Sequence, residues 1–221
     1  KRQLGPVRVQ GSLSELKGDN FFLFDKTTAS PNVHIDNEQK VATWKTQNAR
    51  QGMVLGTRGF KSGVAYWEVS IVKSGMMQAG DVFLGVALKG ARPWRGCGFI
   101  NARYVTSYVQ QELIYGSDFN EGNTIGVLLD MDRGTLAFTR IGYDLNTDKD
   151  TVNHMGLAVR NLKRMLPNPP YNHIFPAFGM ATTDRQNSYG IVDSVVLSIK
   201  NMKWCHTFSE ARKINRIDSM L

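Results

Sequence analysis

The chain is poor in cysteine and has no N-glycosylation acceptor. It holds only Cys97 and Cys205, too few for the disulfide framework of a small secreted domain, and no Asn-x-Ser/Thr pattern. Both features favour a reducing compartment, so we expect a cytoplasmic or nuclear protein. The longest apolar runs, such as IGVLL from Ile125, are too short to cross a bilayer, and no membrane association is expected. No secretory signal or initiator Met opens the sequence, which is expected to be a monomeric domain of a larger chain.

Signatures of catalysis and metal binding are also missing from the sequence. There is no G-x-S-x-G nucleophile elbow and no H-E-x-x-H motif, and the histidines and cysteines are not spaced as zinc ligands. In LDMDRG, Asp130 and Asp132 superficially resemble a calcium loop, but the ligand pattern fails at Gly134 and at Ile141. We therefore predict an acidic hairpin turn there, and a non-enzymatic protein without metal or cofactor.

The stretch LGTRGFKSGVAYWEVSI, residues 55–71, poses a choice between a phosphate-binding loop and a turn before a strand. A P-loop needs a glycine directly before its Lys, but Lys61 follows Phe60. After the glycines, Trp67 and Ile71 belong to an apolar set that alternates with polar residues, the two-residue period of a half-buried strand. The stretch therefore predicts a glycine-rich turn that leads into a β-strand.

Similar strand patterns recur along the chain between turn residues. We expect strands in NFFLF, in NVHI and KVATW (joined at Asp36-Asn37), in DVFLGVAL as a central strand, in YVTSYVQQELIYG, in HIFPAFGM and in SVVLSIKNMKW. The clearest hairpin pairs residues 124–129 with 135–139, and Gly134 can supply its positive φ. KGARPWRGCGFINA is expected to be a loop and residues 143–172 a long polar insert. Only FSEARKINRIDSML, with Ser209 as a possible N-cap, has a helical pattern.

These patterns together predict the fold class. About nine to eleven short strands with turns between them are typical of an all-β protein, a bent antiparallel β-sandwich of two sheets. The hydrophobic content of 42% is sufficient for one such core. No linker interrupts the strand pattern, so we expect a single domain.

The net charge of +8 raises a nucleic-acid alternative. The basic residues are scattered rather than gathered in a long run, which argues against nucleic acid as the main ligand. A scaffold or RNA-associated role in a nucleic-acid-processing complex is kept as the alternative function, and it would give binding that falls steeply with salt. Glycan binding, suggested by sandwich architecture alone, and a hidden enzyme with a perturbed acid or base are the remaining rivals.

Aromatic and arginine residues beside polar turns carry the strongest functional signal. Trp, Tyr and Arg anchor many protein interfaces because they bury a large area and can still hydrogen-bond. We predict one partner-binding surface built from residues 44–50, 92–95 and 182–189. Its candidate contact residues are Trp44, Arg50, Arg92, Trp94, Arg95, Thr182, Arg185 and Tyr189. The alternative for Trp44 and Trp94 is a core position reached by a folded-back loop.

The order of the motifs resembles the SPRY (B30.2, PRY-SPRY) domain family. FDKTTASPNVHIDNEQKVATW resembles the PRY segment, and LGTRGFKSGVAYWEVSI is similar to the family's Gly-x-x-Gly-Phe…Tyr-Trp-Glu-Val hallmark. YGSDFNEGNTIGVLLDMDRGTLAF is similar to its Gly-Asp-x-Ile-Gly…Leu-Asp…Gly-Thr-Leu-x-Phe segment. The resemblance implies a concanavalin-like jelly roll over residues 21–203, including the 143–172 insert. Residues 1–20 and 204–221 are expected to be extensions, and the second of them contains the helical pattern.

The resemblance also implies a function. Members of this family bind partner proteins or peptides through variable loops, and often recognise substrates for ubiquitin ligases, although no RING, SOCS or F-box element is present in this sequence. It implies that Trp67 is a core residue. Asn123 departs from the usual Asp of the family. Ala181, Thr182 and Thr183 stand where the SOCS-box branch has the Val-Trp-Gly that grips an Asn-rich peptide, so that ligand is not expected here.

Overall fold

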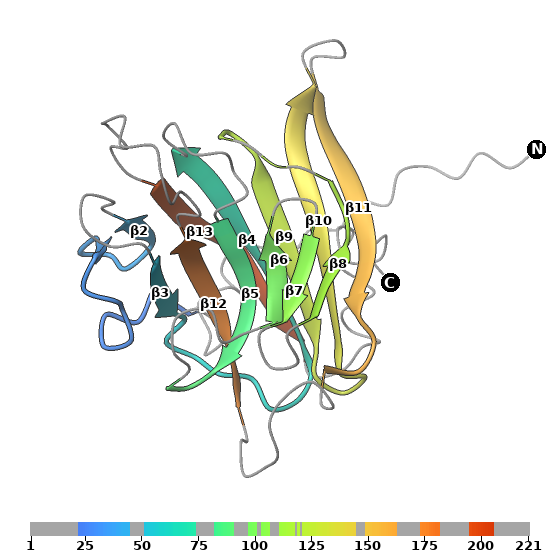
Figure 1. Cartoon of the computed structure of the whole chain (residues 1–221), viewed down its shortest axis with the longest axis horizontal. Coiled ribbons are helices and arrows are strands. Elements are labelled where there is room, and N and C mark those ends of the chain that lie inside the picture. The colour runs from blue at the N-terminus through green and yellow to red at the C-terminus, as the bar shows by residue number, and fades with distance from the viewer. Residues whose placement is uncertain are drawn as a thin grey trace, which may run out of the picture.

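The computed structural model describes most of the chain as two antiparallel β-sheets (Figure 1). The described residues are 22–44, 51–73, 82–90, 97–100, 103–106, 111–117, 119, 121–144, 149–162, 173–181 and 195–205. The seven-stranded sheet has the order β1 (Val33–Ile35), β2 (Val41–Trp44), β13 (Val195–Cys205), β4 (Val64–Lys73), β9 (Thr124–Asp130), β10 (Thr135–Asp144) and β11 (Lys149–Val159). The six-stranded sheet has the order β3 (Gln51–Leu55), β12 (Ile174–Ala181), β5 (Val82–Leu88), β6 (Cys97–Ile100), β7 (Arg103–Thr106) and β8 (Gln111–Ile114). The predicted all-β sandwich is confirmed.

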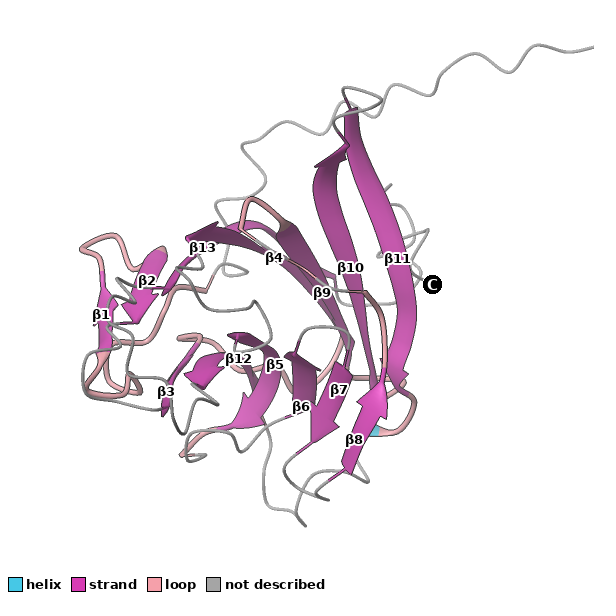
Figure 2. Cartoon of the chain, turned by 45° about the horizontal axis from the view of Figure 1, so that its top comes forward, coloured by secondary structure: helices cyan, strands magenta, loops and turns pink. Residues whose placement is uncertain are grey.

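The core lies between the two sheets, which face each other in Figure 2. Alternate residues of each inner strand point into it, as the two-residue period of a strand requires. Trp67 of β4 is fully buried and stacks on Phe60 with ring centroids 6.4 Å apart, while Phe22 meets its edge at 5.8 Å. The expectation that Trp67 is a core residue is confirmed.

The PRY-like segment protects one edge of the six-stranded sheet. Edge strand β3 receives hydroxyl side chains from the TTAS stretch: the Met53 N–H donates to Ser30 Oγ and the Leu55 N–H to Thr28 Oγ1, both at 3.0 Å. These bonds satisfy backbone groups that an edge strand otherwise leaves open. The strand expected in NFFLF is reduced to an isolated bridge between Phe24 and Gly56.

Two other expectations are corrected. Cys97–Ile100, expected to be part of a loop, is strand β6, paired with β5 and β7. Its one glycine serves packing, since a Cβ at Gly98 would lie 2.6 Å from the Phe83 ring. The 143–172 insert begins as a regular hairpin, because β10 continues to Asp144 and pairs with β11. β11 is an edge strand with mostly exposed side chains, so it needs no apolar alternation.

Tyr115 joins the two sheets on the side where β8 approaches β10 and β11 (Figure 2). A bulge in the β10–β11 pairing falls between Ala137 and Thr139. There the Phe138 N–H donates to Tyr115 Oη at 3.3 Å, and the same hydroxyl donates to the Gly156 carbonyl oxygen at 2.6 Å. The hydroxyl thus bridges β10 and β11 where the bulge interrupts their backbone hydrogen bonds. In the described part of the chain, no helix is long and apolar enough to cross a bilayer.

Candidate partner-binding site

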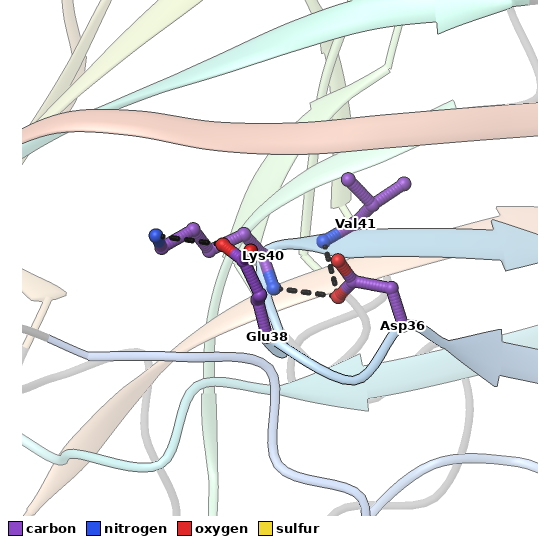
Figure 3. Close-up of polar contacts among 4 residues, drawn as sticks. All are labelled: Asp36, Glu38, Lys40 and Val41. Carbon is purple, nitrogen blue, oxygen red and sulfur yellow. Dashed lines mark hydrogen bonds and ion pairs between the residues drawn. The ribbon is translucent and has the colours of Figure 1, made fainter.

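One end of the sandwich, here called the turn end, carries the short turns joining β1 to β2 and β9 to β10 and the longer 56–63 turn, which crosses from β3 in one sheet to β4 in the other. The first of them is shown in Figure 3. The Asp36 carboxylate accepts hydrogen bonds from the backbone N–H groups of Lys40 and Val41, at 2.8 and 3.0 Å. Gln39 adopts a φ of 58°, a left-handed conformation that this turn requires. The side chain of Asp36 therefore fixes the turn from within.

The glycine-rich stretch between β3 and β4 is a turn, as predicted, and not a phosphate loop. A Cβ at Gly59 would lie 2.7 Å from the Cβ of His173 and from the Phe175 ring, so the chain passes too closely for any side chain. Lys61 is exposed, and the segment leads into a strand rather than into the helix N-terminus that a phosphate site uses.

The β9–β10 hairpin uses its two carboxylates as hydrogen-bond acceptors within the protein. Asp130 Oδ1 accepts from the N–H groups of Asp132 and Arg133, at 3.0 and 2.8 Å. Asp132 Oδ1 accepts from the Gly63 N–H at 2.9 Å, and Gly134 has the expected positive φ of 68°. The predicted acidic hairpin turn is confirmed. Over the described residues, no group of three or more His, Cys, Asp or Glu side chains is gathered for a metal ion.

The opposite end of the sandwich, here called the loop end, lies at the top of Figure 1, where β4 finishes. In the seven-stranded sheet, Trp44 pairs with Val195 and Lys73 with Val196. In the six-stranded sheet, Ala181 pairs with Gln51, next to the start of β5. These pairings bring three connections to one end: residues 45–50, 74–81 and 182–194, each of which joins one sheet to the other.

Trp44 belongs to the floor of the loop end and not to its surface. The side chain is fully buried in the main core, and its Nε1 donates to the Gly52 carbonyl oxygen at 3.1 Å. A Cβ at Gly52 would lie 2.6 Å from Asn32 Oδ1, so a glycine permits this close packing. This corrects the expectation that Trp44 contacts a partner, because a buried indole offers no area to one.

The other candidate contact residues lie outside the described residues, and only the strand ends that flank them can be placed. Arg50 falls in the 45–50 connection; Thr182, Arg185 and Tyr189 fall in the 182–194 connection. Both connections start at the loop end. The 74–81 connection, between β4 and β5, starts there too. This connection joins strands of different sheets, and no local sequence pattern reveals that property.

The 92–95 loop, with Arg92, Trp94 and Arg95, also lies outside the described residues, and its flanking strands end elsewhere. It follows the end of β5 at Leu88, opposite Ile174, which is the turn end of the six-stranded sheet. A hollow of about 280 Å³ lies beside this point, lined by Thr27, Thr28, Ser30, Met53, Leu55, Lys89 and Gly90. Of the three predicted segments, 45–50 and 182–189 are thus flanked by strand ends at the loop end, and 92–95 by a strand end at the turn end.

The SPRY domain family model matches residues 64–188. The SPRY domain of human HERC1 shares 18% identity with a TM-score of 0.55, covering 80% of this chain and 97% of that one. The stonustoxin structure shares 18% identity with a TM-score of 0.55, covering 81% and 27%. The TRIM65 PSpry domain shares 15% identity with a TM-score of 0.51, covering 89% and 100%. These likenesses to solved structures concern the fold alone.

Proposed function

Since the chain belongs to the SPRY domain family, a family of protein-interaction modules, we propose that it binds a partner protein or peptide at its loop end without catalysing a reaction. The observation that carries this proposal is the gathering of three sheet-crossing connections over a packed floor. A rigid floor reduces the conformational entropy lost when loop side chains engage a ligand. Loops held on such a scaffold are also where binding residues concentrate.

Arg185 and Tyr189 are the proposed contacts in the 182–194 connection. A tyrosine buries a large ring at low entropy cost, and an arginine can pair with carboxylates or backbone carbonyls. Arg50 is the proposed contact in the 45–50 connection. That connection is followed by Gln51, which pairs with Ala181. Two cationic side chains and one aromatic side chain suit a peptide with acidic and apolar residues.

The test is affinity capture from cell lysate with the 221-residue chain as bait, with nuclease and with low- and high-salt washes. The test variant is Arg185→Ala/Tyr189→Ala. The matched control is Lys61→Ala, an exposed cationic residue at the turn end. We expect a discrete protein to survive high salt with the wild type and the control, and to be lost with the double variant.

Two outcomes would contradict this proposal. Loss of the captured protein with Lys61→Ala but not with the double variant would move the site to the turn end, and Trp94→Ala would then test the 92–95 loop. Recovery of RNA-dependent material that washes away with salt would instead favour the nucleic-acid alternative.

Recognition of substrates for a ubiquitin ligase stays a prediction that rests on the family resemblance. Its test is whether the captured protein becomes ubiquitinated faster when the parent protein of this domain is expressed, and whether Arg185→Ala/Tyr189→Ala removes that increase. No change in ubiquitination would contradict the ligase role without contradicting partner binding.

A further inference from the structure

The outer face of the seven-stranded sheet is buried over part of β4, β9 and β10, although none of the described elements packs on it (Figure 2). In β4, Trp67 and Val69 point into the main core, so the alternate residues Tyr66 and Glu68 stand on the outer face. Tyr66 is only 2% exposed and Glu68 only 1%. A tyrosine on a bare sheet face keeps much of its ring in water, and an uncovered carboxylate stays hydrated. The face must therefore be covered.

The buried area continues across β9 and β10. Tyr66 pairs with Leu128, which in turn pairs with Ala137, and all three side chains are buried. The Tyr66 ring lies over Gly126, since a Cβ at that glycine would lie 2.6 Å from Tyr66 Oη and would collide with Thr139 Oγ1. Apolar and hydroxyl groups thus form one continuous buried patch on the outer face.

The patch has clear margins. Three large apolar side chains are exposed among the described residues: Val72 at 53%, Val152 at 44% and Leu157 at 41%. Val152 and Leu157 belong to this same face, because they pair with Ile141 and Ala137. Val72 lies at the end of β4, where the pairing with β13 is irregular. The buried part from β4 to β10 spans two strand spacings, or about 10 Å. A helix that lies across these strands covers that distance in about two turns.

We propose that residues 206–221 dock on this outer face as an amphipathic helix. The strand before them, β13, ends at Cys205, which pairs with Val64 at the start of β4, so the chain leaves β13 next to the patch. In residues 206–221, which lie outside the described part, Phe208, Ala211, Ile214 and Ile217 recur at every third position. At about 100° per residue these four side chains fall within one half of a helix, and that half is proposed to lie on Tyr66, Leu128 and Ala137.

Length and direction support the same occupant. A helix over residues 208–221 is about 21 Å long, whereas the path from β13 across β4 and β9 to β10 is about 14 Å. The other terminal segment, residues 1–21, joins the described chain at Phe22. That ring packs against Trp67 with centroids 5.8 Å apart, on the core side of the sheet. The described chain therefore begins on the core side of the sheet and not at its outer face.

This docking is independent of the proposed partner binding, since it concerns the broad outer face and not the loop end. The direct test is a double-mutant cycle in the full chain, using Ile214→Ala in the segment and Leu128→Ala on the sheet. The readout is the unfolding equilibrium constant from denaturant titration. Each single variant should increase the unfolding equilibrium constant by some factor. We expect the increase in the double variant to be at least about twofold smaller than the product of the two single factors, because side chains in contact do not act independently.

Two matched controls make the cycle decisive. Met53 is a buried residue that packs in a separate apolar cluster of the six-stranded sheet, so Met53→Ala with Ile214→Ala should give multiplicative effects. Ile214→Asp and Ser219→Asp change the charge equally, but only the first interrupts the apolar side. We expect Ile214→Asp alone to increase binding of a fluorescent apolar dye. Multiplicative effects for Leu128 as for Met53, or equal dye binding by the two Asp variants, would overturn the docking.

Discussion

The turn end and the loop end of the sandwich are built by different means. At the turn end, side chains hydrogen-bond to the backbone of their own turns. The carboxylates of Asp36 and Asp130 accept hydrogen bonds from N–H groups two to five residues later in the chain. Gly59 allows the chain to pass against His173 and Phe175. At the loop end, strand pairing fixes where the connections begin, at positions such as Gln51 and Ala181. A protein built in this way can vary one end without disturbing the other, which suits binding at the loop end.

The largest expected effect is at the floor of the loop end. Trp44→Ala should lower the free energy of unfolding by about 3–5 kcal/mol, because it leaves a large cavity in the core. Trp44→Phe keeps much of the volume but removes the donor to the Gly52 carbonyl, and should cost about 1–2 kcal/mol. Denaturant titration measures both. Normal stability in Trp44→Ala would mean that Trp44 is a surface residue after all.

The loops above that floor should behave oppositely. Arg185→Ala/Tyr189→Ala should weaken partner binding by about 30-fold or more, as removal of interface anchors does. The free energy of unfolding should change by less than about 0.5 kcal/mol. Calorimetric titration with the captured partner and thermal unfolding measure the two quantities. If the double variant instead unfolds, the two side chains are structural.

A pair of aspartates compares the two ends directly. Asp130→Ala at the turn end should cost about 2 kcal/mol, because the N–H groups of Asp132 and Arg133 lose a buried acceptor. Asp184→Ala, in the 182–194 connection, should leave stability unchanged. Thermal unfolding of both variants is the measurement, and equal losses would mean that the two ends are built alike.

The smallest effect involves Tyr115, which belongs to neither end. Tyr115→Phe should cost about 1 kcal/mol, since Phe138 and Gly156 lose a hydrogen-bond partner. Burial raises the pKa of the Tyr115 phenol, and the Phe138 amide opposes this in part. As pH rises past the usual tyrosine pKa of 10.0, the unfolded chain loses this proton first, so stability is full below that pH and declines above it. Urea titrations on either side of that pH should show a smaller decline in Tyr115→Phe.

Much of the fold could be predicted because its signals are local. Alternation around Trp67 identified β4, and Gly134 marked the hairpin turn, whose positive φ is present. Cys97–Ile100 was missed because Gly98, a turn signal in sequence, serves packing against Phe83. β11 was missed because an edge strand with exposed side chains has little apolar pattern.

The candidate site was harder to predict because its assembly depends on non-local pairing. Trp44 sits beside polar turn residues in sequence, yet pairing with Val33 and Val195 places it in the core. The 92–95 loop and the 182–189 loop looked alike in composition. They depart from opposite ends of paired strands, since β5 and β12 run antiparallel. Composition suggests contact residues, but only strand pairing tells which of them can share a surface.

Hydrogen exchange of the domain with and without its captured partner tests the central claim most directly. The account predicts that bound partner slows exchange in residues 45–50, 74–81 and 182–194, and leaves the turns at 36–40, 56–63 and 131–134 unchanged. Slowed exchange at the turn end, with the three loop-end connections unaffected, would contradict it.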